Sequence, residues 1–353
     1  MEFEEKLYHI FNNQIVGGSI VLIKGEKELK FNYGYSSLMN EKLVEDATIF
    51  RIASISKVII AMAVLKLVEN HRLDLDEDIS NILGYKIRNP KHPKVTITTR
   101  MLMLHTSSIT DGLNEDNLGY NGVNGYHYFV SLKDLLTNSK SNFYSDNTYS
   151  SCLPGEKYIY SNFGAGIITC IIEKCSGQLF TEFVEKNFFK TLYMDASYKA
   201  NNIVKKDKIS DTYTGFTTNK TAQAFIDGTY PNYSLGNNFR GPAGGLFVSM
   251  QDLSKIMIVL MNDGKYKDVQ ILNREMVDML LTMNFFASRY YKEKEVDLKG
   301  YTGGAYGICS VMYFSKLKHT GVCFVANGGH YKPMPTGLNN IQEEVISLLM
   351  SEC

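Results

Sequence analysis

The sequence predicts an α+β fold, with one antiparallel sheet built from both ends of the chain and flanked by helices, and a mainly helical lobe formed by the middle. Strand-like runs separated by short polar turns occur near both termini, and helix-like and loop-like segments lie between them. We therefore expect a sheet domain from residues 1–68 and 241–353, with residues 69–240 inserted as the helical lobe.

The N-terminal elements are a helix and a hairpin. Apolar residues recur with helical spacing between Phe3 and Phe11, which predicts an amphipathic helix. The β-rich run 19–23, a Lys-Gly-Glu turn and the alternating run 29–33 then predict a β-hairpin.

A buried helix comes next. From Ser54 to Val68 the sequence is almost entirely apolar apart from Lys57 and one further lysine, and Ser54 and Ser56 are candidate N-caps. Further along, Asn, Tyr, Ser and Gly concentrate in residues 113–151, where we expect long surface loops.

The C-terminal part predicts a second hairpin and a last helix. Residues 306–314 and 321–326 are rich in β-formers and are separated by the polar turn 315–320. Apolar residues between Ile341 and Leu349 then follow helical spacing.

Composition indicates a folded enzyme-sized protein and excludes several partners. Lys plus Arg equals Asp plus Glu at 37 each, so no overall field recruits nucleic acid or an anionic membrane. The acidic start Met1–Glu5 differs from a secretory signal, and the apolar run 58–68 is too short for a membrane segment. We expect a cytoplasmic protein, or an exported one if a leader preceded Met1. The sequence leaves the oligomeric state open.

Cysteine and histidine spacing indicates no metal site. The six cysteines form no C-x-x-C pair and the seven histidines lack metal-ligand spacing, so free thiols in a reducing compartment are expected.

The first chemical motif is Ser54-Ile55-Ser56-Lys57, an S-x-x-K at the start of the buried helix. Spacing of three places the Ser54 hydroxyl and the Lys57 amine on one helical face, where the amine can accept the serine proton. The alternative is an N-cap serine with a solvated lysine.

The sequence around this motif resembles that of the class C β-lactamase family, which also includes DD-carboxypeptidases, D-amino-acid peptidases and certain esterases. Residues 49–57 resemble its nucleophile segment, and residues 97–107 resemble its I-T-I-R-x-L-L-x-H-T-S segment. Residues 244–253 resemble its G-G-L-x-S-x-x-D-L. The resemblance covers residues 15–330 and implies a β-lactamase/transpeptidase-like fold and a serine hydrolase that needs no cofactor or metal.

The second motif, Tyr160-Ser161-Asn162, matches the Y-x-N of that family. A phenol held beside a lysine ammonium can ionise below its usual pKa of about 10, so Tyr160 is expected to be the general base. Asn162 is expected to bind Lys57 and a substrate amide. The alternative is a core tyrosine, with Asn162 capping the next helix.

The third motif departs from the family pattern, which has Lys, His or Trp before a small residue and Gly. The best match is Tyr301-Thr302-Gly303, followed by Gly304, whose amide is expected to form the oxyanion hole with that of Ser54. A bulge at the two glycines is the alternative. His319-Thr320-Gly321 spells the pattern better, but we reject it because it falls in a polar hairpin turn.

Other catalytic signatures are missing from the sequence. It contains no G-x-S-x-G elbow, H-E-x-x-H, P-loop or G-x-G-x-x-G. His105 falls in a family segment, and we interpret it as a buried histidine satisfied by backbone groups.

The sequence thus predicts a serine acyl hydrolase acting on a small amide, peptide or ester, of the DD-carboxypeptidase, D-amino-acid peptidase or esterase kind. Because Tyr301 replaces the expected cation, efficient β-lactam or D-Ala-D-Ala turnover is disfavoured. The rival is a non-catalytic ligand-binding or penicillin-sensing protein that keeps the fold.

Overall fold

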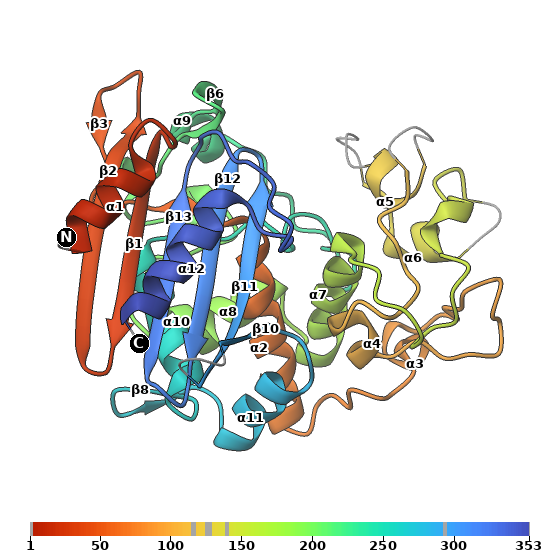
Figure 1. The fold of residues 1–353 in the computed structure, drawn as a ribbon. Coiled ribbons are helices and arrows are strands. Elements are labelled where there is room, and N and C mark those ends of the chain that lie inside the picture. Colours follow the sequence, from red (N-terminus) through yellow and green to blue (C-terminus); the bar gives the residue numbers. More distant parts are fainter. Residues whose placement is uncertain (1–2, 114–117, 124–128, 138–140, 292–294, 353) are drawn as a thin grey trace. The chain divides into compact units, whose positions relative to one another are not determined.

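The computed structural model describes residues 3–113, 118–123, 129–137, 141–291 and 295–352, which form two compact units (Figure 1). The first unit comprises Met1–Val58, Glu185–Tyr230 and Gly244–Cys353, and the second comprises Ile59–Val184 and Pro231–Ala243. The predicted division into 1–68 with 241–353 and 69–240 differs from these units over residues 59–68, 185–230 and 241–243, and it stays a proposal about domains.

A seven-stranded antiparallel sheet organises the first unit. In spatial order its strands are β10 (Ala287–Tyr291), β11 (Val296–Ala305), β12 (Ile308–Ser315), β13 (Thr320–Ala326), β1 (Gly17–Lys24), β2 (Lys27–Ser37) and β3 (Lys42–Leu43). Gly18 of β1 lies opposite Ala326 of β13, so strands from the two ends of the chain are neighbours in the middle of the sheet. The predicted sheet and both predicted hairpins are confirmed.

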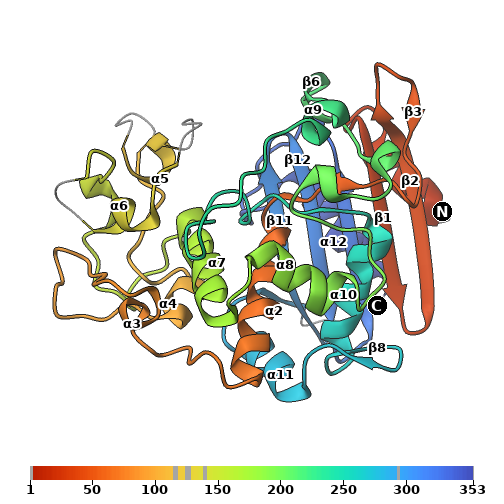
Figure 2. The same cartoon turned by 180° about the vertical axis from the view of Figure 1, so that it is seen from behind.

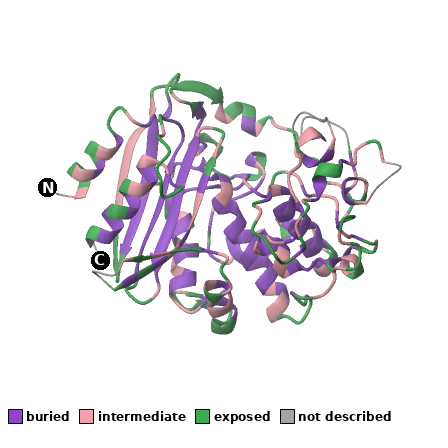
Figure 3. Ribbon diagram, turned by 45° about the vertical axis from the view of Figure 1, so that its right-hand side comes forward, coloured by how far each residue is buried: buried purple, intermediate pink, exposed green. Residues whose placement is uncertain are grey.

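Helices cover both faces of this sheet. The helices α1 (Phe3–Phe11) and α12 (Asn340–Glu352) lie on one face, and α10 (Met250–Met261) lies on the other, as Figures 1 and 2 show from opposite sides. The Phe11 ring stacks on Phe324 with centroids 5.1 Å apart. Figure 3 shows the central strands buried while the outer sides of α1 and α12 are exposed. Both predicted terminal helices are therefore confirmed.

Shorter elements complete the first unit. They are β4 (Phe50–Arg51) paired with β7 (Phe247–Val248), β5 (Thr212–Thr214) with β6 (Thr217–Lys220), β8 (Lys265–Tyr266) with β9 (Val269–Gln270), and the helices α9 (Ala222–Ile226) and α11 (Arg274–Thr282). The β4–β7 pair matters most here, because β4 leads directly into the segment that carries Ser54.

The second unit is mainly helical. It contains most of α2 (Ser56–Glu69), and α3 (Ile79–Leu83), α4 (Thr99–Met103), α5 (Gly119–Gly122), α6 (Leu132–Leu136), α7 (Asn162–Ser176) and α8 (Phe180–Val184). Helix α7 packs against α3 and α4. Part of the loop region predicted over 113–151 lies outside the described residues.

A buried carboxylate on α7 holds the returning segment 231–243 to the second unit. Glu173 is fully buried and accepts hydrogen bonds from the backbone N–H groups of Phe180 and Gly236 and from the Asn238 amide. Burial raises the pKa of Glu173, although these donors favour its charged form.

Among the described residues, no helix combines the length and the apolar character needed to cross a membrane.

Candidate active site

Ser54 lies in a 3₁₀ turn, Ala53–Ile55, that leads into α2. The Lys57 ammonium nitrogen donates to the Ser54 hydroxyl oxygen over 3.1 Å, as the spacing of three predicts. Lys57 is only 3% exposed, so the alternative of a solvated lysine is wrong. The sequence therefore brings a hydroxyl and a buried amine together at one helix start.

The turn that carries Ser54 has a strained backbone and a buried clamp. Ala53, directly before Ser54, has φ +49°, a left-handed conformation that non-glycine residues rarely adopt. The Ser56 hydroxyl donates to the Ala53 carbonyl over 2.6 Å and accepts from the Leu246 N–H over 3.1 Å. Ser56 is therefore a buried bridge that holds the turn against the segment before β7.

Ser310 on β12 attaches the same turn to the sheet. Its hydroxyl donates to the Ile52 carbonyl over 2.9 Å, and its strand partner across β11 is Gly303. A Cβ atom at position 303 would lie 2.8 Å from the Ile52 carbonyl oxygen and 3.0 Å from the Ser54 nitrogen. Only glycine lets β11 approach the Ser54 amide this closely.

The predicted third motif lies on β11 beside this turn. The pairing of β11 with β12 runs without a register shift from Lys299 to Ala305, so the alternative of a bulge at Gly303 and Gly304 is wrong. Thr302 is half-buried, while Gly304 is exposed and has open space where a side chain would project. The rejected match at His319 does lie in the turn between β12 and β13, with φ +49°.

Arg51 ties two further segments of the first unit together. Its Nε donates to the Gly244 carbonyl over 2.9 Å, and its guanidinium lies 4.0 Å from the centre of the Tyr306 ring. Burial lowers the pKa of Arg51, with Tyr306 acting in the opposite direction. Arg51 of β4 thus holds the start of the Gly244-Gly245-Leu246 motif through its carbonyl.

Tyr160 and Asn162 belong to the second unit. Tyr160 is 39% exposed, so it is not a core tyrosine, and its ring lies 4.6 Å from that of His105. Ser161, not Asn162, is the N-cap of α7, because its hydroxyl accepts from the Gly164 N–H. The alternative interpretation of this motif, a core tyrosine followed by a helix-capping Asn162, is therefore wrong.

His105 is satisfied as predicted. Its Nδ1 accepts the Ser161 N–H over 3.2 Å, and its carbonyl accepts the Ile159 N–H over 2.7 Å. The ring of this buried histidine therefore supports the segment that presents Tyr160.

Asp111 organises the start of α7. One carboxylate oxygen accepts from the Ser161 hydroxyl over 3.0 Å and from the Phe163 N–H over 2.8 Å. The other accepts from the Asn162 side-chain amide over 2.8 Å. A carboxylate at a helix N-terminus is stabilising, and here it also orients the Asn162 amide.

The structure thus places the predicted residues in two groups. Ser54, Lys57 and the strand 301–304 form one group in the first unit, and Tyr160 and Asn162 form another in the second. Sequence reasoning missed Ser310 and Asp111. Within the described part of the chain, no three His, Cys, Asp or Glu side chains gather in a way that could hold a metal ion.

Comparison with known proteins agrees with this fold. The model of the Beta-lactamase family matches residues 3–343, nearly the whole chain. The chain therefore belongs to the Beta-lactamase family.

Individual relatives are distant. Protein flp of Staphylococcus aureus (strain N315) is 25% identical over 326 residues, which cover 89% of this chain and 60% of that protein. This chain thus spans about three fifths of the length of that relative.

The fold is shared with solved structures. A D-amino acid amidase from Ochrobactrum anthropi SV3 superposes with a TM-score of 0.72 at 20% identity, covering 99% of this chain and 100% of that one. The octameric penicillin-binding protein homologue from Pyrococcus abyssi superposes with a TM-score of 0.71 at 21% identity, covering 98% and 75%.

Proposed function

We propose that the chain is a serine acyl hydrolase of the β-lactamase and penicillin-binding-protein type, which forms an acyl-enzyme through Ser54. The observation that carries the proposal is the 3.1 Å hydrogen bond between the Ser54 hydroxyl and the buried Lys57 amine. A serine hydroxyl is a weak nucleophile until a neighbouring group takes its proton, and Lys57 is placed to take part in that transfer.

The reaction has two stages. Ser54 Oγ attacks the substrate carbonyl while its proton passes to the Lys57 and Tyr160 pair, and the same pair then protonates the leaving group. The amides of Ser54 and Gly304 hold the developing oxyanion, and Asn162 binds the substrate amide. Water then attacks the acyl-enzyme and releases the acid.

The proposed substrates are small amides, short peptides or esters. Amide substrates are supported by the fold shared with D-amino acid amidases, and the motif resemblance adds DD-carboxypeptidase-like and esterase-like activity. In this proposal, residue 301 lies beside the leaving group of the substrate. The reason is the family resemblance, which implies at this position a cation or imidazole that helps to hold the substrate carboxylate. Tyr301 offers a neutral hydroxyl instead.

Labelling at Ser54 tests the proposal. The protein is incubated with a fluorophosphonate and with a fluorescent penicillin, and intact mass and peptide mapping locate the adduct. Ser54→Ala should abolish labelling and hydrolysis in a folded protein. Ser56→Ala should still be labelled at Ser54, but with a lower melting temperature, because it leaves the buried Leu246 N–H without its acceptor.

The same experiment distinguishes the rival function. A ligand-binding or penicillin-sensing protein would be labelled once without turnover, whereas the proposed hydrolase releases product repeatedly. Labelling that persists in Ser54→Ala would contradict both functions.

A further inference from the structure

One edge of β11 beside Ser54 is open. β10 pairs with β11 only from Val296 to Gly300, whereas β12 pairs with it as far as Ala305. In the described part of the chain, residues 302–305 therefore have no strand opposite them on the β10 side. An extended substrate can add to such an edge through backbone hydrogen bonds.

An aromatic pair lies at the β10 end of this open edge. Phe285 directly precedes the connection into β10, and its ring stacks on that of Tyr301 with centroids 5.4 Å apart and planes at 28°. We call Phe285 and Tyr301 the aromatic platform. Both side chains are half-buried, so each ring keeps accessible surface.

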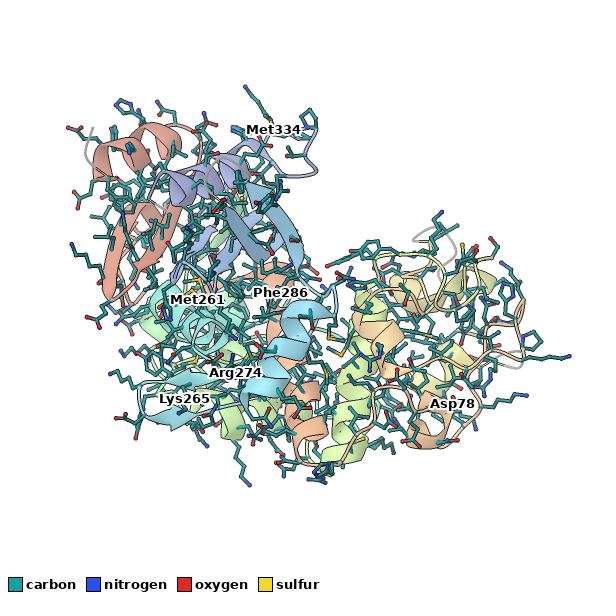
Figure 4. The ribbon with its side chains drawn as sticks, turned by 60° about the horizontal axis from the view of Figure 1, so that its bottom comes forward. Asp78, Met261, Lys265, Arg274, Phe286 and Met334 are labelled. Carbon is teal, nitrogen blue, oxygen red and sulfur yellow. The ribbon has the colours of Figure 1, made fainter. Side chains whose placement is uncertain are left out.

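The core fixes this platform in place. Phe286, labelled in Figure 4, is 5% exposed and packs edge-to-face against Phe314 of β12, with centroids 5.6 Å apart. Its other edge-to-face contact is with Phe285, at 5.1 Å. Phe285 is therefore attached to the sheet through its buried neighbour and is not a loose surface ring.

The platform faces the same side of β11 as the nucleophile turn. Side chains alternate along a strand, so Tyr301 and a side chain at position 303 would project from the same face of β11. A Cβ atom at Gly303 would lie 3.0 Å from the Ser54 nitrogen. Two residues of strand separate positions 301 and 303, which is about 7 Å. That distance suits a group attached one or two atoms beyond the scissile bond.

Two positively charged side chains of the described parts of β10 and β11 have other partners. The Lys299 ammonium lies 3.2 Å from an Asp297 carboxylate oxygen and 3.0 Å from the Ser288 hydroxyl. The Arg289 guanidinium lies over the Tyr313 ring at 5.9 Å. A carboxylate at the platform would meet two uncharged rings, which offer it no charged partner.

We propose that the aromatic platform binds the leaving group, and that the preferred substrates are esters or amides whose leaving group is aromatic or otherwise apolar and uncharged. This inference rests on the proposed function of Ser54. A stacked ring added to a pair of this kind contributes roughly a threefold to tenfold preference over a small alkyl group.

The test uses one acyl group esterified with benzyl alcohol, methanol and glycolic acid, which differ only in the leaving group. The wild type should show kcat/KM values in the order benzyl, methyl, carboxymethyl. Phe285→Ala and Phe285→Leu should both lower the ratio of kcat/KM for the benzyl ester to that for the methyl ester by roughly threefold to tenfold. Phe285→Leu keeps apolar bulk without a stacking ring, which guards against a folding defect in Phe285→Ala. Tyr290→Ala, which removes a 64% exposed ring on β10, is the matched control and should behave as the wild type.

The outcomes separate this inference from the function on which it rests. If Ser54 is labelled by the fluorophosphonate but the benzyl ester is not preferred, or if the Phe285 variants keep the preference, the platform is overturned and the hydrolase stands. Labelling without turnover of any ester also overturns the platform. Absence of both labelling and hydrolysis in the folded wild type overturns both proposals.

Discussion

Asp111→Asn should impair the Y-x-N segment while leaving the Ser54 turn unchanged. The amide has nearly the shape of the carboxylate, and its oxygen can still accept from Ser161 and Phe163. The NH₂ group of the new asparagine, however, faces the Asn162 amide nitrogen. In the wild type that nitrogen donates to the Asp111 carboxylate over 2.8 Å. Two donors cannot bond, so the Asn162 amide must rotate or move.

The expected loss follows from these contacts. A hydrogen bond to a charged group contributes about 1.5–3 kcal/mol. A carboxylate at a helix N-terminus contributes about 0.3–1 kcal/mol more. Asp111→Asn should therefore destabilise the second unit by about 2–4 kcal/mol. Misorienting Asn162 should slow acylation by roughly tenfold to a hundredfold, which corresponds to the loss of one such bond.

The assay combines the rate of Ser54 labelling by a fluorescent penicillin with thermal denaturation. Asn162→Asp alone places two carboxylates in contact, and it should be the least stable variant. The double variant Asp111→Asn/Asn162→Asp restores a donor facing an acceptor, so it should regain stability. It should not regain the labelling rate, because an aspartate at 162 cannot donate to a substrate amide.

Asp146→Asn, which neutralises an exposed carboxylate of the same unit, is the control and should match the wild type. The reasoning is refuted if Asp111→Asn keeps both its labelling rate and its melting temperature. It is also refuted if the double variant is less stable than Asn162→Asp.

Three further predictions follow from the geometry. Lys57→Ala and Tyr160→Phe should each slow acylation by at least about a hundredfold. The double variant should be little slower than either single variant, since groups that transfer one proton act as a unit. Losses that multiply would contradict a proton path shared by the two residues. Ala53→Gly should be neutral or stabilising by up to about 1 kcal/mol in denaturation, because glycine adopts φ +49° without strain, whereas Ala53→Val should be clearly destabilising. Burial raises the pKa of Asp78, but pairing with Arg88 outweighs burial and holds this pKa below its usual value. The resulting stabilisation is present above the pKa of the unfolded state and is lost as pH falls through the folded pKa. Melting temperatures between pH 5 and pH 2 should thus fall less steeply in Asp78→Asn than in the wild type.

Local patterns predicted the features that depend on neighbours in the chain. Ser54 and Lys57 are three residues apart, and one helical turn is enough to bring their side chains together. The terminal hairpins were predicted for the same reason, because alternating runs and their turns are contiguous in sequence.

Long-range contacts explain what sequence reasoning missed. Ser310 reaches Ile52 across 258 positions, and Asp111 reaches Asn162 across 51, so no spacing rule connects them. Strand β10 was also missed, since its side chains are largely exposed and give no buried alternation. Phe285 could be linked to Tyr301 only after β10 had been placed beside β11.

The pairing of β1 with β13 has a consequence for the chain as it is synthesised. The β13 neighbour of β1 is synthesised about 300 residues after it, as the bond between Ile23 and Thr320 illustrates. Until then β1 presents an unsatisfied edge, and such an edge favours slow folding and exposes a nascent chain to aggregation. Ser310 follows Ile52 by 258 positions, so the turn that carries Ser54 gains this contact equally late.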